Sequence, residues 1–133
     1  KVRQITEALL NEDKGVTVDD LMSHYTDDIV SISQGETTVG MKSRTEKTKD
    51  NFRSLWKRKE QGFKYELTNN KIEHCKKLTD SSVLITMTDK LVITKDENAI
   101  HSGVTTAIVM VRHDDTWKIA FETSNIQTIT PRD

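Results

Sequence analysis

The last third of the chain carries three long runs of alternating side chains, separated by very short turns. The runs cover residues 82–94, 99–112 and 117–128, and the turns lie at 95–98 and 113–116. Strands joined by such short turns pair in antiparallel fashion with their neighbours. This part of the sequence therefore predicts a large antiparallel sheet, although it names no substrate.

The first half of the chain predicts helices, one small hairpin and a further strand. Apolar residues recur at helical spacing from Val2, and Thr17 is suited to cap a second helix that continues to Tyr25. The remaining elements are a hairpin at 29–33 and 37–39, a third helix at 41–59 and a strand at 63–78. With helices first and the sheet second, the fold class is α+β, with three N-terminal helices packed on a mostly antiparallel sheet.

The two short turns also predict how the three long strands align. If each turn has four residues, Asp89 lies opposite Val104, Ile108 opposite Phe121, and Val104 opposite Asn125. Because side chains alternate along a strand, one face is then apolar at one end and polar at the other. The polar end holds Asp89, Ser102, Thr106, Thr123 and Asn125.

This graded face suggests a ligand-binding pocket. A carboxylate and an amide on a core-facing surface cost free energy unless they are paired, hydrated or used. An apolar floor with a few convergent polar groups is typical of a small-molecule site. Three alternatives stay open: Asp89 points to water at a rim, it forms a structural pair with Asn125, or the helical aromatics are plain core. The predicted ligand-binding residues are Asp89, Asn125, Thr106, Thr123 and Phe121, with Trp56 and Tyr25 from the helix side.

The opposite face of the same strands also carries small and apolar side chains. An apolar outer face on a sheet indicates that something covers it. Because the helices are needed on the inner face, a second copy of the chain is the simplest cover, in a two-fold homodimer. The residues expected on this face are Val109, Ala107, Val111, Ala120 and Ile126, together with Thr105, Ser124 and Glu122.

Composition narrows the function classes. A length of 133 residues predicts one domain spanning 1–133, and the net charge of -1 argues against nucleic-acid or membrane partners. The single cysteine excludes an intrachain disulfide, and the four histidines show no ligand spacing, so we expect no metal and no cofactor. The chain begins at Lys1, which suggests that an upstream segment was removed and leaves cytoplasmic and exported locations open.

Several segments resemble the nuclear transport factor 2-like superfamily, which includes SnoaL-like proteins and ketosteroid isomerases. The run Tyr25-Thr26-Asp27-Asp28-Ile29-Val30 is similar to the segment that ends the second helix in these proteins. Gly40 before a helix and the final Trp117-Lys118-Ile119-Ala120 are similar as well. The resemblance covers nearly the whole chain. It implies a cone-shaped α+β barrel, in which a strongly curved sheet wraps around helices with an internal pocket, and often a dimer.

The catalytic residues of these relatives do not transfer to this chain. Ser33 stands where the ketosteroid isomerases carry a catalytic Asp, and the first helix has no Tyr. Phe121 and Thr123 stand where other relatives have histidines. We therefore expect a module that binds a small apolar molecule or associates with itself. The alternative is a cofactor-independent lyase, isomerase or cyclase that uses Asp89 as general acid or base.

Overall fold

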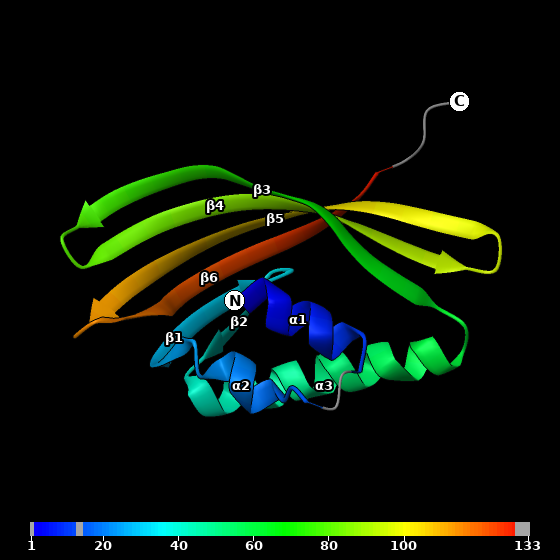
Figure 1. Ribbon diagram of the computed structural model, residues 1–133, viewed down its shortest axis with the longest axis horizontal. Coiled ribbons are helices and arrows are strands. Elements are labelled where there is room, and N and C mark those ends of the chain that lie inside the picture. Colours follow the sequence, from blue (N-terminus) through cyan, green and yellow to red (C-terminus); the bar gives the residue numbers. More distant parts are fainter. Residues whose placement is uncertain (1, 13–14, 130–133) are drawn as a thin grey trace.

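The computed structural model of the chain describes residues 2–12 and 15–129, and it shows helices followed by a large curved sheet (Figure 1). The predicted α+β class is confirmed. The helices are α1 (Val2–Leu10), α2 (Val18–Met22) and α3 (Met41–Glu60). The strands are β1 (Tyr25–Ser33), β2 (Glu36–Val39), β3 (Lys64–Thr79), β4 (Ser82–Lys95), β5 (Asn98–His113) and β6 (Thr116–Ile129).

All six strands form one sheet in the order β2-β1-β6-β5-β4-β3. Neighbours pair antiparallel except β1 and β6, which run parallel. Strands β2 and β3 are edges, each paired on one side, so the sheet is not closed. The sheet is nevertheless strongly curved (Figure 1). The expected strongly curved sheet packed on helices is therefore present, and it is an open sheet.

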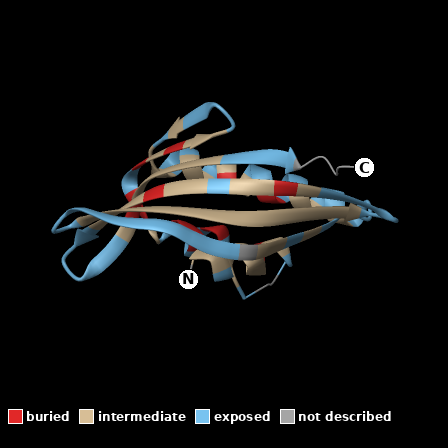
Figure 2. Cartoon of the chain, turned by 90° about the horizontal axis from the view of Figure 1, so that it is seen from above, coloured by how far each residue is buried: buried red, intermediate tan, exposed pale blue. Residues whose placement is uncertain are grey.

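The helices lie on the concave side of the sheet, and the core fills the space between them (Figure 1). The convex face carries no helix and is seen from above in Figure 2, where the central strands are mostly half-buried. Buried apolar residues come from every helix and from three strands. They are Leu9, Val18, Leu21, Met22, Tyr25, Ile29, Phe52, Ile108 and Ile119.

The second helix is shorter than predicted. Thr17 caps it as expected, because its hydroxyl accepts from the Asp20 amide at 3.1 Å while Asp20 Oδ2 accepts from the Thr17 amide at 2.8 Å. The helix ends at Met22, however, and Tyr25 is the first residue of β1. The expectation that the helix continues to Tyr25 is wrong. Pairing of Tyr25 with Ile119 of β6 outweighs the weak helical pattern there.

The alignment of β4 with β5 follows the prediction, with Asp89 opposite Val104. The alignment of β5 with β6 follows it only as far as Ile119, which lies opposite Met110. A β-bulge then leaves Ala120 without a partner, and every later residue of β6 is shifted by one. The predicted facings of Phe121 and Asn125 are therefore wrong, because these residues lie opposite Val109 and Thr105.

The bulge exchanges the two faces along the rest of β6. Side chains that were expected inside now share the outer face with Ala107 and Val109, and side chains expected outside now face the helices. Phe121, Thr123 and Asn125 are on the outer face, and Glu122, Ser124 and Ile126 are on the inner face.

Candidate functional site

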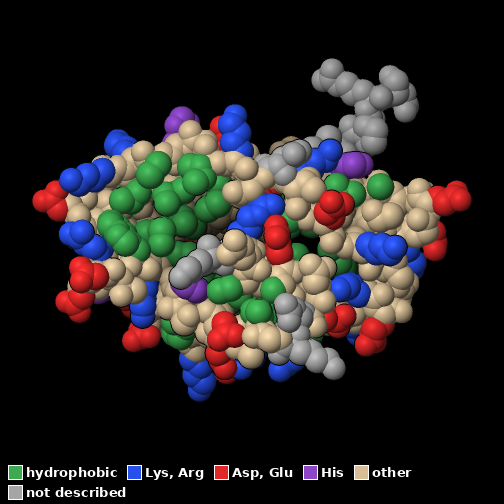
Figure 3. Space-filling model, in the orientation of Figure 1, with side chains coloured by type: hydrophobic (Ala, Val, Ile, Leu, Met, Phe, Trp, Pro, Cys, Tyr) green, Lys and Arg blue, Asp and Glu red, His purple; other side chains and the backbone are tan. Residues whose placement is uncertain are grey.

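A cavity of about 380 Å³ lies on the concave side of the sheet, between α1 and strands β3 to β6. Figure 3 shows apolar side chains gathered on this concave side, over the ends of the long strands beyond the helices. The walls combine aliphatic and methionine side chains with a few polar ones. The lining residues are Val2, Arg3, Thr6, Tyr25, Leu67, Asn70, Met87, Asp89, Thr106, Ile108, Met110, Ile119 and Glu122.

Asp89 reaches this cavity because alternation along β4 places it on the same face as Met87. Its side chain is 15% exposed. Arg3, from the first turn of α1, pairs with Asp89 Oδ1, and the Asn70 amide donates to the same oxygen at 3.0 Å. Among the described residues, Asp89 Oδ2 accepts no hydrogen bond.

Arg3 in turn connects Asp89 to its own helix. Its Nε donates to Glu7 Oε1 at 2.9 Å, one helical turn away, and its guanidinium also donates to the Leu67 carbonyl at 3.3 Å. One arginine therefore bridges two carboxylates, so that the charge of Asp89 is compensated within the cavity wall.

Glu122 is the second acid in the cavity wall, and its side chain is 13% exposed. It accepts hydrogen bonds from the Tyr25 hydroxyl at 3.2 Å, from Ser31 Oγ at 2.9 Å and from Arg44 Nε at 2.7 Å. A second nitrogen of Arg44 lies 2.6 Å away. The carboxylate thus joins β1, β6 and α3, and it faces inward because of the bulge before it.

The phenol of Tyr25 is kept in its neutral form by this environment. Burial raises its pKa well above the ordinary value of 10.0, and the negative charge of Glu122 raises it further. The neighbouring Arg44 opposes part of that shift. Tyr25 therefore donates a hydrogen bond to Glu122 at neutral pH and does not act as an anion.

The structure brings together three of the residues predicted to bind a ligand. Asp89, Thr106 and Tyr25 all line the cavity. The other four lie elsewhere. Phe121, Thr123 and Asn125 are on the outer face, and Trp56 lines a separate groove beside α2, where its Nε1 donates to the Leu9 carbonyl at 2.6 Å. The proposed Asp89–Asn125 pair is therefore excluded by the register.

Sequence reasoning missed Arg3, Glu122 and Arg44. Arg3 carried no signal, since one arginine on a short helix has no characteristic spacing. Regular alternation from Ile119 places Glu122 on the outer face, so the sequence gives no reason to expect it in the cavity. Because Glu122 is not expected inside, the sequence also offers no buried acid with which Arg44 could pair.

Residues 2–12 and 15–129 hold neither a metal-binding cluster nor a membrane-spanning helix. No group of three or more His, Cys, Asp or Glu side chains is arranged to hold a metal ion there. Among the helices of that part of the chain, none is long and apolar enough to cross a membrane.

Comparison with known proteins places this architecture in context. The family model of the SnoaL-like domain matches residues 2–125. No curated protein matches the chain.

Solved structures with the same fold share little sequence with the chain. A ketosteroid isomerase-like protein from Erwinia carotovora atroseptica has a TM-score of 0.64 at 13% identity, covering 98% of this chain and 95% of its own. An NTF-2 like protein of unknown function from Shewanella oneidensis scores 0.59 at 19% identity, covering 93% and 95%. A protein provisionally named scytalone dehydratase, from Novosphingobium aromaticivorans, scores 0.59 at 11% identity, covering 96% and 78%. At these identities the likeness concerns the fold alone.

Proposed function

We propose that this chain, which belongs to the family of SnoaL-like domains, binds a small and mostly apolar molecule in the cavity between α1 and strands β3 to β6. The observation that carries the proposal is the cavity itself. Its volume of about 380 Å³ lies within the range of ligand sites, and its apolar wall is interrupted by a few polar groups.

The electrostatics of the wall support a neutral ligand. Asp89 is paired with Arg3, and Glu122 is paired with Arg44, so neither acid requires a charge from the ligand. A ligand carrying its own charge would leave that charge without a partner in a largely apolar cavity, which is costly. A hydroxyl or amine hydrogen on the ligand, in contrast, finds an acceptor at Asp89 Oδ2.

A thermal-shift screen with sterols and with apolar carboxylates tests this proposal. Neutral sterols, or compounds of similar polarity, are expected to raise the melting temperature more than the carboxylates do. Asp89→Asn keeps the shape of the side chain and removes its charge, so affinity for a binding compound should fall about tenfold or more.

Asp80→Asn is the matched control, because it makes the same substitution at an exposed turn of the sheet. It should leave binding unchanged. If Asp89→Asn binds as tightly as the unaltered protein while the fold is intact, the cavity is not the binding site.

The second candidate function is a cofactor-independent isomerase, dehydratase or cyclase with Asp89 as general acid or base. The favouring observation is that both hydrogen bonds to Asp89 go to Oδ1, which leaves the lone pairs of Oδ2 without a donor among the described residues. Two proteins of the same fold, one ketosteroid isomerase-like and one provisionally named scytalone dehydratase, are compatible with this chemistry.

Proton transfer by Asp89 can be measured directly. A 3-oxosteroid incubated with the protein in heavy water should gain deuterium next to its carbonyl, and Asp89→Asn should abolish the gain. If the steroid binds without any exchange beyond that of buffer, the binding function stands and the catalytic one fails.

We further propose that the chain forms a homodimer through the outer face of its sheet. The shifted register supports this, because it adds Phe121 to an apolar stripe that no helix of the described chain covers. Contiguous apolar patches of this kind mark association surfaces. The stripe consists of the half-buried residues Val30, Ile32, Leu84, Ala107, Val109, Val111 and Phe121.

A further inference from the structure

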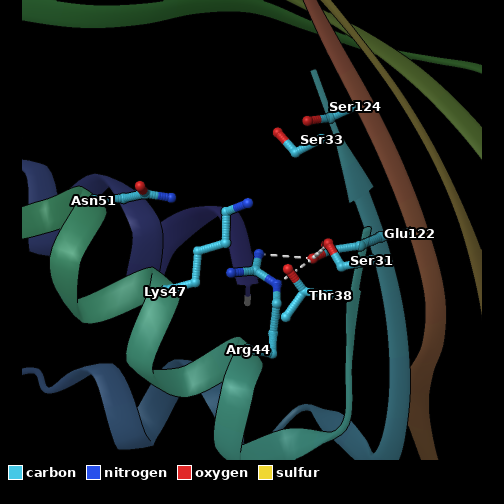
Figure 4. A pocket seen from close by; sticks show the side chains of 8 residues that line it. All are labelled: Ser31, Ser33, Thr38, Arg44, Lys47, Asn51, Glu122 and Ser124. Atoms are coloured by element: carbon cyan, nitrogen blue, oxygen red, sulfur yellow. Dashed lines mark hydrogen bonds and ion pairs between the residues drawn. The ribbon is translucent and has the colours of Figure 1, made fainter. Parts of the chain in front are cut away.

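A second and much smaller cavity, of about 70 Å³, lies between α3 and strands β1, β2 and β6. Figure 4 shows Lys47 and Asn51 reaching from α3 toward the hydroxyls of Ser33 and Ser124 on the sheet. Among the described residues, Glu122 is the only one that lines both this cavity and the larger one. The two cavities are therefore separate spaces on either side of one carboxylate.

The polar character of this cavity comes from two adjacent strands and one face of a helix. Ser33 lies beside Ser124 in the parallel pairing of β1 with β6, with both side chains directed toward α3. Lys47 and Asn51 are one turn apart on α3 and therefore share a face. A helix usually presents apolar side chains to a sheet, whereas here Ser33, Lys47 and Ser124 are half-buried and Asn51 is exposed. A polar layer between a helix and a sheet needs an explanation.

Lys47 is the group in this layer that lacks adequate partners. Arg44 is already satisfied by Glu122, at 2.7 and 2.6 Å. The Lys47 Nζ is closed off from solvent, and its ion pair with Glu36 Oε2, at 2.8 Å, does not have hydrogen-bond geometry. Its N–H groups consequently have no hydrogen-bond acceptor among the described residues.

The present partner of Lys47 is poorly anchored. The Glu36 side chain is 73% exposed on the short edge strand β2, whereas Lys47 is 24% exposed. Glu36 does not line the small cavity, so it approaches the ammonium group from outside. Solvent screening weakens such a pair. Because Nζ has no open surface while Glu36 is in place, an anion in the cavity meets Nζ when Glu36 withdraws.

We propose that this cavity binds a small oxyanion, the size of a carboxylate group, on Lys47 Nζ. The Asn51 amide and the hydroxyls of Ser33 and Ser124 supply further donors. The volume corresponds to roughly two water molecules at about 30 Å³ each, which suits a carboxylate and excludes a ring. Glu36 acts as an internal competitor that occupies Lys47 when the anion is absent.

Titration with sodium acetate, at an ionic strength held constant with sodium chloride, tests the proposal. The backbone amide signals of Ser33 and Ser124 in nitrogen-15 correlation spectra should shift and saturate with acetate. Glu36→Gln removes the competitor and should tighten acetate binding several-fold. Lys47→Met removes the cation and should weaken it by about tenfold or more. Phosphate, which is larger, should bind more weakly than acetate.

Lys42→Met is the matched control, because Lys42 is an exposed residue of the same helix. It should leave acetate affinity unchanged. Should Lys47→Met fail to fold, Ser124→Ala keeps all charges and should still weaken acetate. Shifts equal to those with chloride alone would overturn the proposal, as would unchanged affinity in both Glu36→Gln and Ser124→Ala. Tighter binding of phosphate than of acetate would overturn the assignment to a carboxylate-sized anion.

Discussion

At the scale of single residues, Glu122 accepts more hydrogen bonds in the cavity wall than Asp89, the acid that the sequence predicts there. Its carboxylate takes hydrogen bonds from Tyr25, Ser31 and Arg44, which belong to β1 and α3. An acid that accepts from that many donors fixes the positions of its neighbours. Tyr25 is the neighbour whose protonation reports most directly on this arrangement.

The direction in which Tyr25 makes the free energy of unfolding depend on pH can be predicted. Its folded-state pKa lies above the ordinary value of 10.0, so the unfolded chain loses the phenolic proton first. The contribution of the neutral Tyr25 phenol to the free energy of unfolding is complete below pH 10. It is lost as the pH rises from there through the higher pKa of the folded state. Tyr25→Phe should flatten this alkaline fall in the free energy of unfolding.

The chain has two tyrosines, so Tyr65→Phe leaves Tyr25 as the only one. The ionisation of Tyr25 can then be followed in this variant by tyrosinate absorbance. We expect no tyrosinate signal before alkaline unfolding begins. A reversible signal centred near pH 10 in folded protein would show that the Tyr25 hydroxyl is open to water.

The residues of the cavity were only partly predictable. Asp89 and Thr106 were found because alternation in β4 and β5 is regular, so position alone decides the face. Arg3 and Arg44 come from helices that approach the sheet from elsewhere in the sequence. Nothing in their local pattern shows which acid each will meet, because that depends on how the helices pack.

At the scale of elements, strand β6 shows why the pairing before Ala120 could be predicted and the pairing after it could not. Both hairpins have two central residues, with Asp96 and Asp114 at positive φ, as tight turns require. These turns fixed the start of each pairing correctly. The bulge at Ala120 then reversed the faces, and neither glycine nor proline marks it in the sequence.

A pair of truncations on β6 tests this reversal. Ile119 is buried, so Ile119→Ala should cost about 2–5 kcal/mol at any protein concentration. Phe121 is only half-buried on the outer face, so Phe121→Ala should cost less than about 2 kcal/mol in dilute protein. In a dimer the Phe121→Ala loss should grow with protein concentration.

Urea unfolding followed at a low and a high protein concentration provides the measurement. Equal losses for the two variants, with no dependence on concentration, would return Phe121 to the core and contradict the observed register.

At the scale of the whole molecule, the general class was accessible from the sequence but the closure of the sheet was not. The order of helices and long strands, with the segments around Tyr25 and Trp117, led to the correct family. Whether a sheet closes depends on strand tilt and stagger. Strand tilt and stagger are set by packing, which the sequence does not show. In the structure the short β2 and the long β3 are the two free edges of the sheet.

The proposed dimer makes a prediction at the same scale. Ala107→Arg places a long charged side chain in the middle of the outer apolar stripe and should give a monomer or an insoluble protein. Sedimentation velocity at micromolar concentration, compared with unaltered protein, is the measurement. Ser54→Arg, at an exposed site on α3, adds the same charge away from the sheet and should remain dimeric. A stable monomer of the unaltered protein would contradict the proposal.

The open edge at β3 has a consequence for aggregation. An uncovered edge strand offers its backbone to other chains, and long flat edges promote fibrils. Here three register shifts bend β3, and four lysines line it: Lys64, Lys71, Lys76 and Lys77. The second half of this strand is exposed, as Figure 2 shows. The strand also carries Glu66 and Glu73, so its four lysines leave a net positive charge. The kinks and this net charge discourage strand-by-strand stacking at the edge.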